Sequence, residues 1–185
     1  MGQMETTGNA MIKRLEQMLR VDHAGEHGAV KIYEGQAAVF KNSKKTANSA
    51  ALVREMAEQE QEHMDHFDAV LIERKIRPTL FAPIWDVAGF ALGAGTALMG
   101  EKAAMACTAA VEEVIDAHYA AQIDELKEKN IEPELVKTLE KFRADEAEHR
   151  HTALEHGAEN APFYRLMRRV IKTGCETAIK VSERL

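Results

Sequence analysis

The feature that most constrains this chain is a pattern of glutamate and histidine that occurs twice. Its core is a Glu-x-x-His motif, present as Glu60-Gln61-Glu62-His63 and as Glu146-Ala147-Glu148-His149. On a helix, residues three apart lie one turn apart on the same face. Each motif is preceded at an interval of 34 residues by a further glutamate, Glu26 or Glu112. The chain therefore contains the same helical unit twice.

The interval within each unit predicts how it folds. The midpoint of the first interval is Ser43, and the midpoint of the second is Lys129, which precedes Asn130 and Pro133. Asn, Ser and Pro commonly begin or end helices, so each midpoint is expected to be a turn between two antiparallel helices. At about 1.5 Å per residue, the glutamates of a unit would lie roughly 25 Å from the turn, level with each other across the hairpin.

Two such hairpins predict a metal centre inside a four-helix bundle. Two inward Glu-x-x-His motifs with two further inward glutamates form the ligand set of a di-iron carboxylate site. The predicted metal ligands are Glu26, Glu60, His63, Glu112, Glu146 and His149. All six continue apolar stripes of helical period, where a polar side chain is costly unless something binds it.

A single Glu-x-x-His motif is a weak signal, and Glu148 and His151 form a third one that overlaps the second. The helical period decides between the two. Glu146 and His149 continue the apolar stripe of their helix, whereas Glu148 and His151 are displaced by two residues and point roughly 160° away. We therefore expect Glu148 and His151 to face solvent.

Composition and periodicity predict an all-α fold, with a four-helix bundle and additional apolar and C-terminal helices. Hydrophobic residues make up 45% of the chain and aromatic residues only 5%, which favours helices over sheets. Residues 1–8 are expected to be disordered, and residues 9–185 to form a single di-iron domain. Helices are expected at about residues 9–40, 46–74, 101–129, 132–155 and 161–184.

Residues 79–100 differ from the rest of the chain. Asp86 is their only charged residue, and large apolar side chains dominate. One interpretation is a helix buried at the end of the bundle. The other is a membrane-contacting segment that enters one leaflet with Trp85 near the headgroups. Pro83 and four glycines argue against a regular helix that spans the membrane.

The bulk composition excludes some classes of partner and site. The net charge of -6, from 24 basic and 30 acidic residues, does not suggest a nucleic-acid partner. Cys107 and Cys175 are isolated, so we expect small buried side chains in a reducing compartment rather than a disulfide framework. The N-terminus lacks the pattern of a signal or transit peptide. No GxGxxG nucleotide-binding motif is present.

Two aspartates near the predicted ligands have two interpretations. Asp22 and Asp116 each lie one turn from a ligand glutamate. Either could orient His63 or His149 through the second ring nitrogen, as metal-bound histidines usually require. An ordinary salt bridge on the helix surface is the alternative for both.

Two tyrosines and a glutamate are also ambiguous. Tyr33 and Tyr119 each follow a ligand glutamate by seven residues on the same face. Core packing is the simpler interpretation, with a redox or substrate-facing role as the alternative. Glu113 is off the apolar stripe, so we expect it on the surface.

The ligand set favours oxygen chemistry. Four carboxylates carry about four negative charges, which balance two ferrous ions. Mixed oxygen and nitrogen ligands suit iron or manganese better than the thiolate sets of zinc clusters. Because six protein ligands leave coordination positions open on two metal ions, we expect activation of O₂ and insertion of oxygen into a bound substrate.

Two other functions compete with this interpretation. A ferroxidase, an iron-storage protein or a peroxide scavenger of the ferritin type would share the ligands, but would not need the apolar residues 79–100. A membrane-associated interaction protein would leave six inward polar residues unexplained. Removal of residues 79–100 should abolish oxygenase activity yet leave iron loading intact, whereas a storage protein would lose nothing.

Further strings of residues resemble the demethoxyubiquinone hydroxylases of ubiquinone biosynthesis. The resemblance begins in the first expected helix and covers nearly the whole chain from about residue 10. It is carried by Arg20-Val21-Asp22-His23-Ala24-Gly25-Glu26, Arg77-Pro78-Thr79, Gly89-Phe90-Ala91-Leu92-Gly93-Ala94-Gly95-Thr96-Ala97-Leu98, Val111-Glu112-Glu113, His118-Tyr119, Phe142-Arg143, Glu146-Ala147-Glu148-His149 and Ser182-Glu183-Arg184-Leu185.

This resemblance implies a ferritin-like fold and a di-iron monooxygenase that hydroxylates the ring of a demethoxylated ubiquinol. The six predicted ligands would hold two iron ions per chain, and His118 and Tyr119 match a pair implicated in handling the ring or the reductant. Residues 79–100 would seat the enzyme on a membrane and admit the polyprenyl tail. Two positions depart from the family pattern, His27 after the first ligand and Arg150-His151 after the last.

The resemblance also implies partners and a location. The substrates would be a polyprenyl quinol and O₂, and the second pair of electrons would come from NADH, a partner protein or the quinol itself. A homo-oligomer or a complex with another protein of ubiquinone biosynthesis is expected. The expected location is peripheral, on the cytoplasmic side of a bacterial inner membrane, or on the mitochondrial inner membrane for a mature eukaryotic chain.

Overall fold

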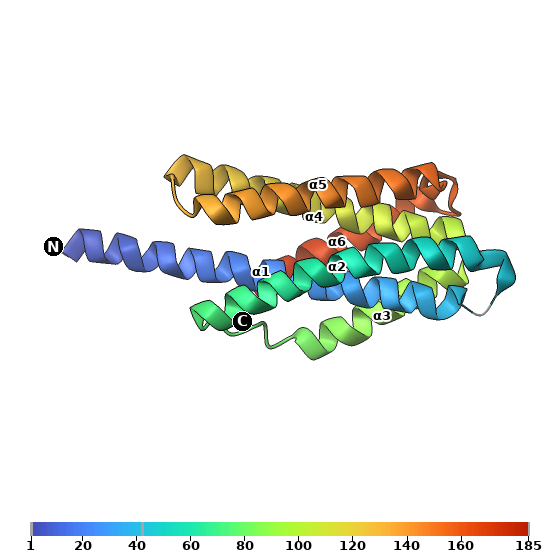
Figure 1. The fold of residues 1–185 in the computed structure, drawn as a ribbon, viewed down its shortest axis with the longest axis horizontal. Helices are drawn as coiled ribbons and strands as arrows, with labels where there is room; N and C mark the ends of the chain where they lie inside the picture. Colours follow the sequence, from blue (N-terminus) through green and yellow to red (C-terminus); the bar gives the residue numbers. More distant parts are fainter. Residues whose placement is uncertain (1, 42, 185) are drawn as a thin grey trace.

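The computed structural model describes residues 2–41 and 43–184, and this part of the chain is mainly helical, without a strand. Figure 1 shows long, nearly parallel helices that run along one axis. They are α1 (Gly2–Phe40), α2 (Ala47–Arg74), α3 (Ala82–Leu98), α4 (Glu101–Lys129), α5 (Pro133–Glu155) and α6 (Tyr164–Ser182), with short 3-10 helices at Lys44–Thr46 and Ala158–Asn160. The all-α prediction is confirmed: α1, α2, α4 and α5 form a ferritin-like four-helix bundle, to which α3 and α6 are added.

The two predicted turns lie where the midpoints of the intervals place them. After α1, the side chain of Ser43 accepts a hydrogen bond from the backbone of Lys45 and caps the short 3-10 helix before α2. After α4, Asn130 adopts a left-handed conformation with φ of 51°, and Pro133 occupies the first turn of α5. Such C-caps and N-terminal prolines end one helix and begin the next. Helix α4 has the predicted bounds, Glu101–Lys129.

The start of α1 differs from the prediction. A disordered segment was expected at residues 1–8, whereas α1 begins at Gly2, and residue 1 lies outside the described residues. Residues 2–8 contain no proline, and Gln3, Met4 and Glu5 are good helix formers, so the helix continues past Asn9. Figure 1 shows this end of α1 extending beyond the bundle. Ile12, in the N-terminal part of α1, is 59% exposed.

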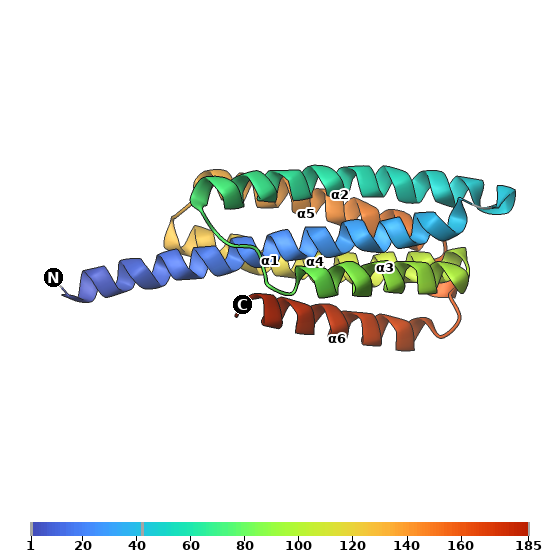
Figure 2. The same ribbon diagram turned by 90° about the horizontal axis from the view of Figure 1, so that it is seen from below.

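Helix α3 packs closely against α1, as Figure 2 shows. Gly93 allows this approach, because a Cβ there would lie 1.9 Å from the backbone oxygen of Ile32. Gly35 on α1 makes the reverse contact, since its Cβ would lie 2.3 Å from the backbone oxygen of Phe90. The single charged residue of this segment, Asp86, lies 2.6 Å from Nε2 of His27. Helix α3 is therefore seated on α1 by backbone contact and one polar pair.

Helix α6 is held against α4 by a charged cluster. Glu113 accepts hydrogen bonds from Nε of Arg168 at 2.7 Å and from Nζ of Lys172 at 2.6 Å. Burial raises the pKa of Glu113, but these two cations outweigh it and lower the pKa. The expectation that Glu113 lies free on the surface is wrong, because α6 covers that side of α4.

Helices α3 and α6 lie away from α2 (Figure 2). Both helices expose apolar side chains. The large apolar residues of this region that are more than two-fifths exposed are Ile84, Val87, Phe90, Leu98, Met99, Phe163, Leu166 and Val170. None of the helices in the described ranges is both long and apolar enough to cross a membrane.

Candidate metal centre

The structure brings all six predicted ligands together at the centre of the bundle. Each has a relative exposure of 3% or less. Their ligand atoms form two overlapping groups that share Glu60 and Glu146, each group lying within 4.8 Å. The first group is Glu26, Glu60, His63 and Glu146, and the second is Glu60, Glu112, Glu146 and His149.

Both histidines face the carboxylates through Nδ1. Nδ1 of His63 lies 3.2 Å from Oε1 of Glu146 and 3.5 Å from Oε2 of Glu26. Nδ1 of His149 lies 3.0 Å from Oε1 of Glu60 and 3.5 Å from Oε2 of Glu146. Each Glu-x-x-His motif thus places its histidine beside a glutamate of the other motif.

The donor atoms fit a pair of divalent cations. Eight buried ligand atoms form no hydrogen bond in the described structure: Oε2 of Glu26, both carboxylate oxygens of Glu60, Nδ1 of His63, Oε2 of Glu112, both oxygens of Glu146 and Nδ1 of His149. Buried polar atoms nearly always have partners, so eight at one point indicate a missing cation partner. These buried clusters of glutamate and histidine can hold a metal.

The titration behaviour of the metal-free cluster reflects its crowded negative charge. Burial and the neighbouring carboxylates raise the pKa of Glu60 and Glu112 well above the ordinary value. Burial also raises the pKa of Glu146, but the adjacent imidazoles of His149 and His63 outweigh it and lower the value to about 2. Burial lowers the pKa of His63, but Glu146 and Glu26 raise it to about 10. Bound cations would take over the role of these protons.

Two side chains hold the histidines through the other ring nitrogen. Nε2 of His63 lies 3.1 Å from Oδ2 of Asp145, and Nε2 of His149 lies 2.5 Å from Oε1 of Gln59. Of the two interpretations given for Asp22 and Asp116, orientation of His63 or His149 is not the one that the structure supports, because Asp145 and Gln59 make these contacts. Asp22 and Asp116 lie near ligands of their own helices, α1 and α4. The second ring nitrogen of each histidine instead faces the neighbouring helix, which is α5 for His63 and α2 for His149.

The spacing of Gln59 and Asp145 from the two histidines could have identified these residues in the sequence. Gln59 and His63 are four residues apart, as are Asp145 and His149. Each polar residue therefore lies on the same side of its helix as the histidine and can reach the facing helix. Asp116 is instead engaged by Nε of Arg143, at 2.6 Å from its Oδ1.

Both tyrosines of the inner stripes donate hydrogen bonds to predicted ligands. The hydroxyl of Tyr33 donates to Oε1 of Glu112 at 2.7 Å, and that of Tyr119 donates to Oε1 of Glu26. Burial and the adjacent carboxylates raise the pKa of both phenols well above the ordinary value. Each tyrosine is therefore a neutral donor that orients one outer glutamate, and not only a packing residue.

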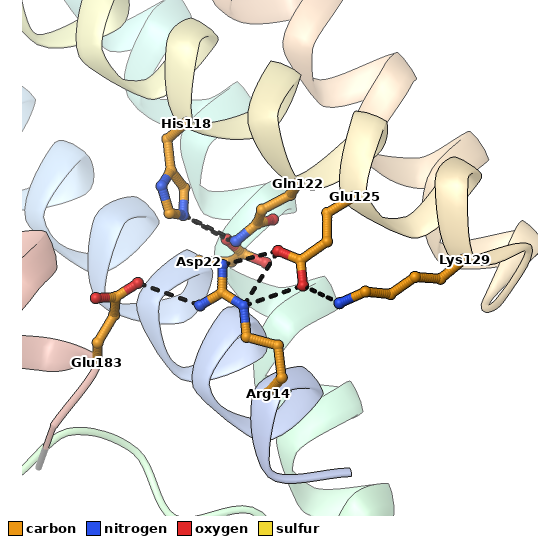
Figure 3. A network of polar contacts seen from close by, with 7 residues as sticks. All are labelled: Arg14, Asp22, His118, Gln122, Glu125, Lys129 and Glu183. Atoms are coloured by element: carbon orange, nitrogen blue, oxygen red, sulfur yellow. Dashed lines mark hydrogen bonds and ion pairs between the residues drawn. The ribbon is translucent and has the colours of Figure 1, made fainter. Parts of the chain in front are cut away.

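His118 lies outside the ligand cluster, in a polar network between α1 and α4 (Figure 3). Its Nε2 lies 3.3 Å from Oδ1 of Asp22 and 2.8 Å from Nε2 of Gln122. Gln122 also donates to Oδ1 of Asp22 at 2.8 Å. Burial raises the pKa of Asp22, against the opposing effect of the hydrogen bond with His118. The side chain of His118 is 18% exposed, so the network extends from the interior toward solvent.

The same figure shows a second part of this network, centred on Arg14 (Figure 3). Arg14 donates to Glu125 of α4 at 2.9 Å and to Glu183, just after α6, at 3.3 Å. Lys129 also contacts Glu125, at 2.5 Å. The network therefore ties α1 to α4 and to the end of α6.

An apolar cavity of about 360 Å³ lies between α1, α3, α4 and α6. Gly25 and Gly28 form part of its wall, and a Cβ at either position would meet nothing within 4 Å. Two of its lining residues, Gly25 and Val111, directly precede Glu26 and Glu112 in the sequence. Helices α1 and α4 thus present the predicted ligands on one side and the apolar cavity on another.

Comparison with known proteins gives the family. Residues 13–182 match the family model described as "Ubiquinone biosynthesis protein COQ7". The chain belongs to this family. The matched region contains every predicted ligand and every residue that lines the cavity.

Several curated relatives of this COQ7-family chain are hydroxylases by name. A Dictyostelium discoideum protein, "NADPH-dependent 3-demethoxyubiquinone 3-hydroxylase, mitochondrial", is 50% identical over 92% of this chain and 77% of its own length. A Rhodospirillum rubrum protein, "3-demethoxyubiquinol 3-hydroxylase", is 50% identical over 92% of this chain and 78% of its own length. A human relative with the same name as the Dictyostelium protein is 44% identical over 97% of this chain and 82% of its own length.

Proposed function

We propose that this chain is a 3-demethoxyubiquinol 3-hydroxylase, a di-iron monooxygenase of ubiquinone biosynthesis that uses O₂ and an external reductant. The observation that carries the proposal is the pair of overlapping, buried ligand groups in a chain that is 50% identical to a named 3-demethoxyubiquinol 3-hydroxylase. The reaction replaces a ring C–H by C–OH, and the second oxygen atom leaves as water. Two electrons and two protons must therefore come from outside the ring.

The proposed iron ligands are Glu26, Glu60, His63, Glu112, Glu146 and His149. When bound, the two iron ions would supply the electrons and the open coordination positions through which O₂ is activated. Glu60 and Glu146 belong to both ligand groups, so they would contribute to holding both ions. The cluster is closed to bulk water, since none of its residues is more than 3% exposed.

The surrounding residues of the chain orient the ligands and handle protons. Tyr33 and Tyr119 hold the outer glutamates by their hydroxyl groups, which fixes the carboxylates in one rotamer. We assign His118 and Asp22 the task of carrying protons between solvent and the centre, because their contact joins a partly exposed imidazole to a fully buried carboxyl.

The apolar cavity is the proposed substrate site. Its walls come from α3 and α6, the two helices whose outer faces expose large apolar side chains. Trp85 lines it, and the indole N–H of Trp85 is buried without a hydrogen bond, so it offers a donor to an oxygen of the quinol ring. We propose that α3 and α6 lie on a membrane surface, peripherally, and that the polyprenyl tail enters between them. Cosedimentation of the protein with vesicles would test this contact.

The electron donor is proposed to be a reduced nicotinamide nucleotide. The rat and Dictyostelium relatives are named as NADPH-dependent, whereas the name of the Rhodospirillum protein mentions no electron donor. Consumption of NADH or NADPH that requires both the quinol and the iron-loaded protein would support the assignment. Consumption that is independent of either would contradict it.

The decisive experiment follows the oxygen atoms. The protein is loaded with Fe(II) without air and then incubated with demethoxyubiquinol, reductant and ¹⁸O₂. We expect two irons per chain and a hydroxylated quinol that carries one labelled oxygen. The control variant Glu112→Ala should lose iron and product together. Oxygen uptake with unchanged quinol would favour the alternative, a ferritin-like ferroxidase, and refute the hydroxylase proposal.

A further inference from the structure

We propose that Asp145 and Gln59 are positioning residues that make the two halves of the metal centre unequal. Asp145 acts through His63 and Gln59 acts through His149. The metal ion beside His63 would then be held more tightly than the ion beside His149. The inference rests on the proposed metal pair, and it goes further by stating which of the two positions fills first.

The two residues make reciprocal contacts across the seam between α2 and α5. Gln59 directly precedes Glu60 in the first motif, and Asp145 directly precedes Glu146 in the second. Each contacts the histidine of the opposite motif. Asp145 on α5 contacts His63 on α2, and Gln59 on α2 contacts His149 on α5. The structure thus repeats one pattern twice, with one difference in chemistry, a carboxylate on one side and an amide on the other.

Both contacts select the same ring nitrogen for the metal. The carboxylate of Asp145 and the amide oxygen of Gln59 only accept hydrogen bonds, so Nε2 of each histidine donates to its partner. This leaves Nδ1 of His63 and of His149 directed at the glutamates, buried and without a hydrogen bond. An outer acceptor of this kind fixes the tautomer and raises the basicity of a metal-bound imidazole.

Most other features of the centre match across the two halves. Each ligand group has three glutamates and one histidine. Each outer glutamate accepts a hydrogen bond from one tyrosine hydroxyl. The aromatic neighbours differ, since Phe142 stacks on His63 at 3.9 Å and Tyr33 meets His149 edge-on at 6.2 Å, but neither ring carries a charge. The charge of Asp145 is therefore the main chemical difference next to the two imidazoles.

The expected size of the effect follows from the type of contact. Hydrogen bonds to charged groups are roughly twice as strong as neutral ones, and removal of an outer partner typically costs 10–100-fold in metal affinity. The side chain of Asp145 is 33% exposed, so solvent screens part of its charge. We therefore expect a difference of about tenfold, at the lower end of that range.

The test compares four forms of the full-length protein: wild type, Asp145→Asn, Gln59→Glu and the double variant that carries both changes. Metal-free protein is loaded without air with one and then two equivalents of ⁵⁷Fe(II), and Mössbauer spectra are recorded at each step. In the wild type, one quadrupole doublet should fill about tenfold in preference to the other. The doublet that disappears in His63→Ala belongs to the position beside His63, and this should be the doublet that fills first in the wild type.

The variants make opposite changes, so damage to the fold cannot imitate the result. Asp145→Asn should let both doublets fill in parallel by weakening the preferred position. Gln59→Glu should do the same by strengthening the other position. The double variant should restore the preference with the positions exchanged, and Asp145→Glu should retain the order of the wild type.

Failure of this inference is distinguishable from failure of the proposed function. If the wild type binds two irons whose doublets fill in parallel, or if Asp145→Asn leaves the order unchanged, the inference is overturned while the metal pair stands. If the wild type binds well under two irons per chain, the proposed function and the inference fall together.

Discussion

The contact between α1 and α3 makes a sharp prediction about Gly93. A Cβ at this position would lie 1.9 Å from the backbone oxygen of Ile32 and 2.7 Å from its backbone carbon, whereas real Cβ atoms keep at least 3.0 Å. Gly93→Ala therefore requires the two helices to separate by roughly 1 Å or more, since a backbone carbonyl inside α1 cannot turn away. Overpacking of this kind costs about 1–3 kcal/mol.

Gly95 provides a matched control on the same helix. It lies two residues later, is exposed, and has nothing within 4 Å of its Cβ position. Replacement of a helical glycine by alanine at such a site should stabilise the protein by about 0.5–1 kcal/mol. Gly93→Ala and Gly95→Ala should therefore differ by roughly 1.5–4 kcal/mol in free energy of unfolding, with opposite signs relative to the wild type.

Trp85 makes the assay direct, because it is the only tryptophan of the chain and lies on α3. Guanidinium titrations followed by its fluorescence report on α3, and far-UV circular dichroism reports on the whole bundle. We expect Gly93→Ala to shift the fluorescence transition to lower denaturant, while Gly95→Ala shifts it slightly upward. Equal midpoints for the two variants would refute the idea that backbone contact seats α3 on α1.

Three further predictions follow from the site and its surroundings. Because the pKa values of Glu60 and Glu112 are raised in the metal-free protein, their contribution to stability is present below about pH 4.5 and lost as pH rises through the raised values. The melting temperature of the metal-free protein should fall from pH 5 to pH 8, and the metal-loaded protein should show a smaller fall; a rising curve for the metal-free protein would contradict this. Glu113→Gln should destabilise the protein by about 1 kcal/mol in denaturant titrations, because Arg168 and Lys172 lose a charged partner, whereas Glu134→Gln on the exposed face of α5 should have no measurable effect. Gly28→Leu should fill the apolar cavity, so KM for the quinol should rise at least severalfold in steady-state assays while two irons remain bound; an unchanged KM would place the substrate elsewhere.

The positions of the six predicted ligands could be read from the sequence because a helix fixes them locally. Glu26 and Glu112 lie on the apolar stripes of long helices, and the equal intervals to the two Glu-x-x-His motifs set their height in each hairpin. The helical period also distinguished the solvent-facing motif at Glu148 and His151 from the two motifs that face the interior. The structure leaves the side chain of His151 71% exposed.

Contacts between helices were harder to predict, since they depend on which helix lies beside which. Asp22 could have oriented a ligand histidine or formed a surface salt bridge, but in the structure it is buried beside His118 and Gln122. The true partners, Gln59 and Asp145, reach across a seam between α2 and α5 that no local period reveals. Residues 79–100 likewise allowed a buried helix or a membrane-contacting segment, and nothing in their sequence indicated that α1 is the helix they pack against.

Each ligand group draws on both hairpins, and this has a consequence for the order of synthesis. The first hairpin supplies Glu26, Glu60 and His63 but needs Glu146 from α5 to complete its group. A ribosome must therefore make most of the chain before either group of four exists. A half-made chain exposes only three of these side chains on an unpaired hairpin, so it should not capture a redox-active ion in a complete ligand shell. Because each ligand group includes one glutamate from the other hairpin, metal binding would wait until the bundle has closed.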